Sequence, residues 1–490
     1  MPPLGLEARR RVTLVATVIG SSLAFIDATV VIVALPTIER DLDLGLTGQQ
    51  WVFLSYSLAL AALYLVAGAI GDRFGRRSTF AAGAAGFALA SALAGAAPNG
   101  EVLIGARTLQ GIAGAFLTTN SLALLRAVYG DRAGWAIGIW SSTTAIATIA
   151  GPPAGGAIVE WASWRWIFYV NLPLAAATVV LARVGRCPEP GKVRVGRMDV
   201  GGAALAALGF GALTFGLVEG ADRGFGTLWW AFALAAGALT AFAIVERRVA
   251  EPMLPLALFR GRNFAAANAE TFLVYAALYG FFVYFTLHLQ TIGFTPFEAG
   301  LANVPPSVAI ALLAARFGGL ADRHGPRLFL TLAPVLIGAG TLLTLLVTSR
   351  SSFWTAGLAA IAVFSLGLSM LVAPITATAL KSAPERHAGI ATGINTTVSR
   401  LGSLLAVALI GLVVSLVFRA QTDDTAAEPL TKGLDGPALA ASIDAYRAGM
   451  VVAIVLALAG AVVGAVAISN RDARGGDEQV SEPAPAPAGS

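Results

Sequence analysis

The chain has 490 residues, of which 57% are hydrophobic and only 12% are charged. The charged share is about half that of an average soluble domain, which excludes an ordinary soluble protein and indicates one embedded in a membrane. The net charge of +5 does not indicate nucleic-acid binding, because the basic residues stand in short clusters between apolar runs, as topology signals do in membrane proteins.

Apolar runs of about 18 to 25 residues, each long enough to cross a bilayer as a helix, recur along the chain. When Arg9 to Arg11 are placed in the cytoplasm, the loops richest in arginine and lysine all fall on that side, which predicts an even number of crossings and two cytoplasmic termini. The Pro- and Ala-rich end, 471–490, is predicted to be a disordered tail. We predict about fourteen spans, near 12–35, 49–70, 78–97, 103–126, 135–158, 166–184, 200–219, 229–245, 264–288, 298–317, 328–348, 353–376, 389–418 and 446–468.

The first span contains one carboxylate, Asp27. An acidic side chain in hydrocarbon costs roughly 2.5–3.5 kcal/mol, so such residues usually face a protein interior or a water-filled path. At 1.5 Å per residue, Asp27 and Arg107 both lie about 8 Å from the outer boundary of the bilayer. We predict that the two interact, directly or through water or a polar neighbour, and that they couple transport to protons. The alternative is that Arg107 reaches the outer headgroups and Asp27 has another partner.

Two loops share a sequence pattern: residues 71–77 and 321–327 agree at four of seven positions, an Asp, an Arg, a Gly and a final Arg. Each loop follows an even-numbered predicted span, so the two copies have the same orientation, as parallel repeats do. The repeat predicts an all-α integral membrane protein with two six-helix bundles, 1–184 and 263–470, joined by a linker, 185–262, that holds two extra helices.

The repeated loops are also candidates for a conformational latch between helices. A glycine permits the tight turn, and an aspartate beside arginines can form charge-assisted hydrogen bonds with a neighbouring helix end. A basic loop that only fixes topology is the alternative. The latch residues are Gly71, Asp72, Arg73, Gly75, Arg76, Arg77, Asp322, Arg323, Gly325 and Arg327.

In the fifth span Ala147, Gly151 and Gly155 recur every four residues and form a smooth face that another helix can approach closely. Pro152 interrupts the backbone hydrogen bonds there. We predict that this face closes a cavity against the opposite bundle; ordinary helix packing is the alternative. Gly156 follows the face directly in the sequence.

Polar and aromatic residues inside other spans are candidates for the substrate cavity: Glu270, Tyr275, Tyr279, Asn120, Asn395 and Arg400. The tyrosines suit planar amphiphiles through stacking and cation–π contacts, although a lipid-facing position is an equal alternative, as a position reaching the headgroups is for Glu270. The sequence shows no cluster of metal ligands and no phosphate-binding loop, so we expect no metal or cofactor and a proton gradient rather than ATP as the energy source.

Taken in order, these motifs resemble the major facilitator superfamily, and within it the drug:proton antiporters with fourteen transmembrane helices. The resemblance covers about Val12 to Ile468 and includes the first-helix, fourth-helix, fifth-helix and thirteenth-helix motifs at 27–36, 107–111, 151–156 and 400–402. It implies that Arg107 takes part in proton transfer and that the fifth helix marks an exporter. One departure is that the tenth predicted span carries only Glu298, at its outer edge, which points away from multivalent cations and toward a neutral, zwitterionic or monocationic substrate.

We therefore expect a monomeric transporter in the bacterial cytoplasmic membrane, in contact with lipids and not with nucleic acid. It would export an amphipathic small molecule, such as a drug, an antibiotic or a metabolite, by alternating access in exchange for protons. The alternatives are an exporter of an endogenous lipid, siderophore or amino-acid-like metabolite and, from a different class, a non-transporting receptor or scaffold. No grouping of a nucleophile with a base indicates an enzyme.

Overall fold

The computed structural model describes residues 5–185, 200–249, 256–383, 388–422 and 427–470, and over these ranges it contains helices joined by short turns and no strand. The predicted tail, 471–490, and parts of the predicted linker, 186–199 and 250–255, lie outside the described residues. The helices in chain order are α1 (Leu6–Leu42), α2 (Gly45–Phe74), α3 (Arg76–Gly95), α4 (Gly100–Tyr129), η1 (Gly130–Arg132), α5 (Ala133–Trp161), α6 (Trp166–Tyr169), α7 (Asn171–Val184), α8 (Val200–Arg223), α9 (Trp229–Arg248), η2 (Leu256–Arg260), α10 (Arg262–Thr291), α11 (Pro296–Leu301), α12 (Val304–His324), α13 (Pro326–Thr344), α14 (Arg350–Ser352), η3 (Phe353–Gly357), α15 (Leu358–Lys381), α16 (Ala388–Gln421) and α17 (Gly436–Ala467).

The prediction of an all-helical membrane protein is confirmed, and helices occupy all the predicted spans. Within the described ranges, 12 helices are long and apolar enough to cross a membrane, or 13 if the bent pair Gly45–Tyr64 and Val66–Phe74 is counted as one span. The 29-residue helix α5 is not among them. The total of fourteen crossings therefore stays a prediction.

Helix ends differ from the predicted ranges because apolar runs report only the hydrocarbon thickness, whereas helices continue beyond it. The last helix begins at Gly436 instead of near 446, directly after Asp435 and with a proline in its first turn, where the missing amide hydrogen costs nothing. Three predicted spans are divided into shorter helices: α6 with α7, α11 with α12, and α14 with η3 and α15.

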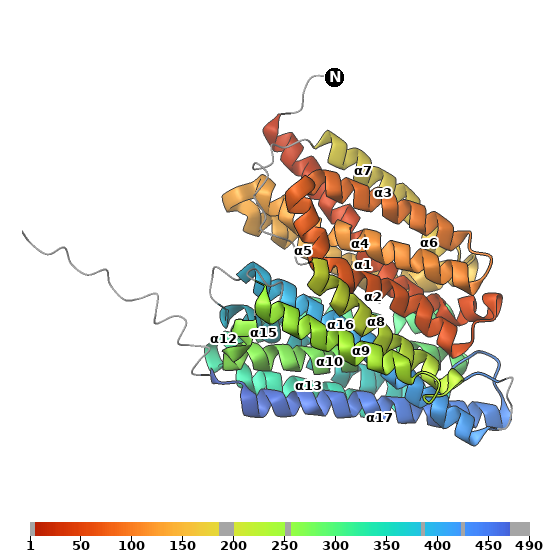
Figure 1. Cartoon of the computed structure of the whole chain (residues 1–490). Coiled ribbons are helices and arrows are strands. Elements are labelled where there is room, and N and C mark those ends of the chain that lie inside the picture. Colours follow the sequence, from red (N-terminus) through yellow and green to blue (C-terminus); the bar gives the residue numbers. More distant parts are fainter. Residues whose placement is uncertain (1–4, 186–199, 250–255, 384–387, 423–426, 471–490) are drawn as a thin grey trace, which may run out of the picture.

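Two helical bundles make up the molecule, one formed by α1 to α7 and the other by α10 to α17 (Figure 1). They converge at one end and separate toward the other, where the chain begins at α1 and α17 ends. We call the latter the terminal end and the former the distal end. Both repeated loops turn at the terminal end through a glycine with positive φ, +105° at Gly75 and +92° at Gly325, a conformation that favours glycine.

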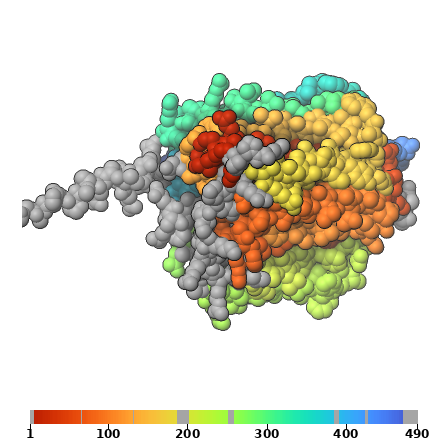
Figure 2. Space-filling model, turned by 90° about the horizontal axis from the view of Figure 1, so that it is seen from above, coloured from red at the N-terminus to blue at the C-terminus, as the bar shows by residue number. Residues whose placement is uncertain are grey.

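The two linking helices, α8 and α9, pack against each other, and α8 also packs against α2 of the first bundle and α16 of the second. In the space-filling view onto the first bundle, these helices (yellow-green) emerge along one edge, and helices of the second bundle (teal) emerge along the opposite edge (Figure 2). The linking helices therefore cover one side of the seam between the bundles.

Candidate functional site

An ion pair lies in the core of the first bundle. The Asp27 carboxylate on α1 accepts a hydrogen bond from Nη1 of Arg107 on α4, and the two residues are 2% and 0% exposed. The structure thus brings together the two charged residues that depth counting placed level. A buried pair overcomes its desolvation cost only when further hydrogen bonds satisfy both groups, so the surrounding side chains matter.

Three polar side chains complete the surroundings of Asp27. Asn171 on α7 donates to Oδ1 at 2.9 Å, and Gln110 on α4 donates to the same oxygen at 3.2 Å. Gln110 also accepts from Arg107 at 2.8 Å and donates to Ser91 on α3 at 2.8 Å. A change in the charge of Asp27 therefore affects bonds to three other helices of the same bundle.

Arg107 also connects this network to α2. Its Nε donates to the Val52 carbonyl at 3.1 Å, and its guanidinium carbon lies 4.4 Å from the centroid of the Tyr56 ring, which favours a cation–π interaction. Tyr56 in turn donates to the Ala24 carbonyl of α1 at 3.1 Å. Arg107 thus holds α2 in place while it neutralises Asp27.

A cavity of about 300 Å³ lies between the two bundles. Such a volume is at the small end of the range for small-molecule sites, and its mainly apolar wall with a few polar groups is typical of them. The predicted cavity residues Tyr275 and Tyr279 line it. The other lining residues are Thr29, Ile32, Val33, Thr148, Pro152, Leu278, Phe282, Thr286, Asn303, Ser307, Ile310, Leu368 and Val372.

The bundles meet tightly at the distal end. Gly156 of α5 faces α11 so closely that a Cβ atom there would lie 2.6 Å from Cα of Phe297. The Phe297 amide donates to Glu160 at 3.2 Å, and Gln50 of α2 donates to Tyr284 of α10 at 3.0 Å. The cavity is therefore closed on its distal side by contacts between the bundles.

At Gly151 and Gly155, the small-residue face of α5 packs against α1 within the first bundle. A Cβ on Gly155 would lie 2.7 Å from Cγ1 of Val30, and one on Gly151 would overlap the hydroxyl of Thr29. Gly300 of α11 approaches Pro152 equally closely. The fifth-helix motif thus contacts both α1 and the opposite bundle.

Four of the predicted cavity residues are not among those that line it. Glu270 is fully buried, and neither carboxyl oxygen has a hydrogen-bond partner among the described residues. Its Cγ lies 3.9 Å from the position of a Cβ on Gly460 of α17. Asn395 donates to Thr271 at 2.9 Å and to Asn268 at 3.3 Å, both on α10. These side chains pack between helices of the second bundle.

The other two residues lie close to α2. Asn120 donates to the Ala67 carbonyl at 3.1 Å and fills the space beside Gly71, where a Cβ would overlap its amide oxygen. Arg400 of α16 places its guanidinium carbon 5.4 Å from the ring centroid of Tyr64. Asn120 therefore explains the glycine at position 71, and Arg400 reaches across the seam.

The repeated loops form ion pairs at the terminal end. Asp72 accepts from Arg76 at 2.7 Å, and Arg76 donates to the Ala123 carbonyl of α4 at 3.3 Å. In the second copy Asp322 of α12 accepts from Lys381 of α15 at 2.9 Å. Each of these pairs lies within one bundle. The other basic residues of the two loops, Arg73, Arg77, Arg323 and Arg327, lie beside them in the chain.

Ser91, Asn171 and Tyr56 received no role from the sequence, and Gln110 was noted only as part of a motif. A signal was present, because Ser91 and Asn171 are polar residues inside predicted spans, where polar groups usually face the protein interior. The hydrogen-bond network that joins both residues to Asp27 depends on how α3, α4 and α7 pack against α1, and no single span reveals that packing. Among the described residues no group of three or more metal-binding side chains occurs.

Comparison with known proteins identifies the family of the chain. The Major Facilitator Superfamily profile matches residues 17–407 and 271–490. The chain belongs to the Major Facilitator Superfamily. It is 35% identical over 408 residues to the multidrug resistance protein Stp of Mycobacterium tuberculosis, covering 82% of this chain and 75% of Stp. It is 34% identical over 469 residues to the puromycin resistance protein pur8 of Streptomyces alboniger, covering 93% of this chain and 90% of pur8.

Another relative, the tetracenomycin C resistance and export protein of Streptomyces glaucescens, is 31% identical over 435 residues, covering 84% of this chain and 78% of the relative. Among solved structures, an inward-facing bacterial homologue of the human lysosomal transporter Spinster aligns with a TM-score of 0.66 at 17% identity, covering 98% of this chain and 99% of that one. At this identity the structural likeness shows the fold alone. The chain is thus a multi-pass membrane protein with the fold of a transporter superfamily.

Proposed function

We propose that this protein exports an amphipathic small molecule across the bacterial cytoplasmic membrane in exchange for protons, with Asp27 as the proton carrier and both termini in the cytoplasm. It acts as a monomer and needs no metal, cofactor or ATP. The names of its relatives, which include resistance and export proteins for puromycin and tetracenomycin C, support drug or antibiotic efflux. With the terminal end in the cytoplasm, the structure corresponds to a state closed toward the outside.

The observation that carries this proposal is that one helix serves both the ion pair and the cavity. Asp27 lies two residues before Thr29, which lines the cavity and packs against Gly151 of α5. Protonation of Asp27 removes its charge attraction for Arg107, and the resulting shift of α1 acts directly on the cavity wall.

A second connection runs through α2. Arg107 holds the Val52 carbonyl, and the next residue, Phe53, lies with its ring centroid 6.5 Å from that of Tyr279 on the cavity wall. Release of Arg107 from Asp27 therefore loosens α2 at the point where it contacts the opposite bundle. The proton and the substrate act on the same two helices without sharing a binding site.

The proton gradient is sufficient for this work. Each proton that moves inward yields about 2.3 kcal/mol per 100 mV of membrane potential and about 1.4 kcal/mol per pH unit. A hundredfold gradient of a neutral substrate costs about 2.7 kcal/mol. One proton per substrate therefore meets the cost at ordinary gradients.

Efflux from vesicles with an imposed pH gradient tests the proposal, with a compound panel that includes puromycin and tetracenomycin C. We expect Asp27→Asn to abolish proton-driven efflux while the protein remains folded in the membrane. Asp43→Asn is the matched control, because Asp43 is an exposed carboxylate just beyond the end of the same helix. Normal efflux by Asp27→Asn would refute the assignment of the proton carrier, and no efflux of any compound by the wild type would refute export.

A further inference from the structure

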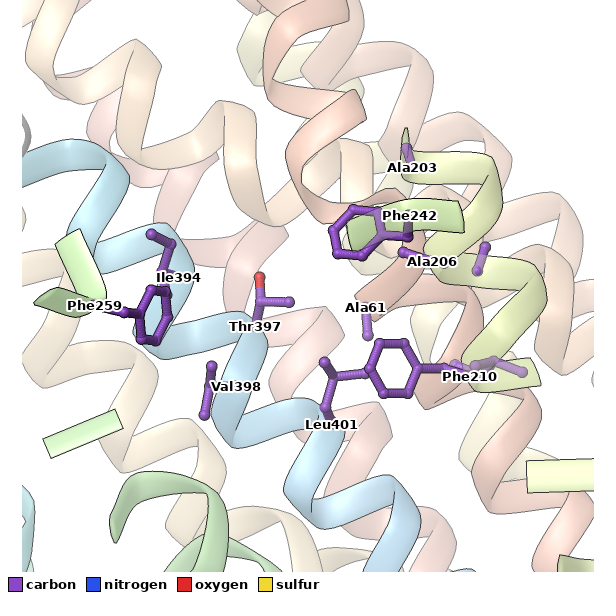
Figure 3. Close-up of a pocket in the computed structure, with 13 residues that line it drawn as sticks. Ala61, Ala203, Ala206, Phe210, Phe242, Phe259, Ile394, Thr397, Val398 and Leu401 are labelled. Atoms are coloured by element: carbon purple, nitrogen blue, oxygen red, sulfur yellow. The ribbon is translucent and has the colours of Figure 1, made fainter. Parts of the chain in front are cut away.

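A second pocket lies away from the central cavity, beside the seam between α2 and α16 (Figure 3). Its volume is about 170 Å³, and the linking helices α8 and α9 together with η2 complete its wall. Because α8 packs against both α2 and α16, the linking helices cover this part of the seam and form one wall of a partly open apolar pocket. We call it the seam chamber.

The wall of the seam chamber is shaped for a flat apolar group. Phe210, Phe242 and Phe259 come from three different elements and point into it, whereas Ala61 and Ala206 leave room (Figure 3). An apolar cavity of roughly 150 Å³ in another protein stays dry and binds benzene. The seam chamber therefore has the size and the surface for one aromatic ring.

One hydroxyl group interrupts this apolar wall. Among the described residues that line the chamber, Thr397 of α16 has the only polar side chain. Its Oγ1 is buried and has no hydrogen-bond partner in the described part of the chain. A buried hydroxyl without a partner is costly. A ring that carried one oxygen atom would satisfy this hydroxyl, whereas a plain hydrocarbon chain would not.

We propose that the seam chamber is an accessory binding site for the exported compound, and that it takes an aromatic ring bearing one hydroxyl or carbonyl oxygen. The proposal rests on the proposed export function and gives the two linking helices a role in it. Since α2 and α16 belong to different bundles, a movement of one bundle against the other changes the shape of the chamber. The bound ring is therefore held in one state of the transporter and released in another.

Photolabelling tests the site in the full-length protein in phosphatidylethanolamine–phosphatidylglycerol nanodiscs, without any pH gradient. The probe is a phenol that carries a trifluoromethyl-diazirine group. We expect saturable labelling of α8 and α16 that excess phenol suppresses. Ala206→Leu fills the chamber and should reduce labelling at least about tenfold, and Thr397→Val, which removes only the hydroxyl, about fivefold.

The matched control is Ala204→Leu, the same replacement at an exposed position of the same helix, which should leave labelling unchanged. If Ala206→Leu does not fold, Thr397→Val, which has nearly the same shape as the wild type, carries the test. Labelling that does not saturate, that is as strong on α17 as on α8, or that persists in folded Ala206→Leu or Thr397→Val overturns the proposal. Labelling displaced by shorter-chain phospholipid but not by phenol overturns it as well, in favour of a lipid.

The result is separate from that for proton coupling. Labelling is measured without a pH gradient and efflux with one, so the two measurements can fail independently. Intact labelling with no efflux in any condition refutes export and leaves the site, whereas normal efflux with no specific labelling refutes the site alone.

Discussion

The first helix of each bundle carries one fully buried carboxyl group, and the two have opposite surroundings. Asp27 of α1 is bonded to a cation and two amide side chains. Glu270 of α10 is 0% exposed, and over the ranges that the structure describes neither of its oxygens has a hydrogen-bond partner. The repeated fold therefore surrounds one buried carboxyl group with polar partners and leaves the other without them among the described residues.

This difference shows how the two bundles divide the work. In the first bundle Arg107, Gln110 and Asn171 all bond to the Asp27 carboxylate, so a change in its charge would alter their hydrogen bonds. The second bundle instead contributes aromatic rings to the cavity, including Tyr275, Tyr279 and Phe282. We infer that proton coupling belongs to the first bundle, whereas most of the apolar contact with the substrate belongs to the second.

The largest effect is expected from removing the cation of the first bundle. Arg107→Met leaves Asp27 buried without its main partner, and such a loss typically costs about 3–5 kcal/mol. We expect a clear fall in the temperature of unfolding of the purified protein, measured by the intrinsic fluorescence of its tryptophans, together with loss of proton-driven efflux.

The double variant Asp27→Asn with Arg107→Met separates these two effects. It no longer contains an unpaired charge, so we expect it to recover most of the stability but none of the proton-driven efflux. If Arg107→Met alone were as stable as the wild type, burial of the Asp27 carboxylate would not depend on Arg107. The proposed difference between Asp27 and Glu270 would then be refuted.

The next largest effect concerns the place where the two bundles meet. A side chain at Gly156 would overlap the α11 backbone at Pro296 and Phe297, so Gly156→Leu should prevent distal closure and reduce efflux at least about tenfold, the consequence of a barrier raised by 1.4 kcal/mol. Gly138→Leu is the control, since a Cβ at Gly138 of the same helix meets no atom within 4 Å.

Expression and the elution volume in size-exclusion chromatography should be the same for Gly156→Leu and Gly138→Leu. Equal efflux by the two variants would show that transport does not need the close contact between α5 and α11 at Gly156.

Much of this arrangement could be predicted from the sequence. Hydropathy located every helical span, and the repeated loops predicted glycine turns that the structure confirms at Gly75 and Gly325. Depth counting placed Asp27 and Arg107 level because rise per residue is fixed by backbone geometry. These features depend on one helix at a time or on a local motif.

What could not be predicted depends on the rotation of one helix against another. Glu270 and Tyr275 lie five residues apart on α10, yet Tyr275 lines the cavity and Glu270 packs toward α17. Five residues correspond to a rotation of about 140° from the starting face, at 3.6 residues per turn. The sequence alone does not say which of the two faces points inward.

A smaller effect is expected at the carboxyl group of the second bundle. Glu270→Gln keeps the shape of the side chain and strands no cation, so we expect efflux within about twofold of the wild type and a change in stability below about 1 kcal/mol. Vesicle efflux and thermal unfolding check this. Loss of proton-driven efflux to the level of Asp27→Asn would mean that both bundles take part in coupling.

The smallest effect is expected at a third carboxyl group, which lies in the loop before α17 and touches the start of α2. Glu428 accepts from the Leu46 amide at 3.4 Å. Burial raises its pKa above the ordinary value, the bond from Leu46 opposes this rise, and the nearby Asp222 carboxylate adds to it.

Because the folded protein keeps the proton on Glu428 to a higher pH than the unfolded chain does, the stabilisation from this group is present at low pH and is lost as the pH rises through the raised pKa. In the wild type, the unfolding temperature should therefore fall as the pH rises above the ordinary carboxyl pKa of about 4.3. Glu428→Gln should make this fall less steep. Glu101→Gln, at an exposed glutamate on α4, should leave the profile unchanged. A profile in Glu428→Gln as steep as in the wild type would show that protonation of this carboxyl group is not linked to the packing of its neighbours.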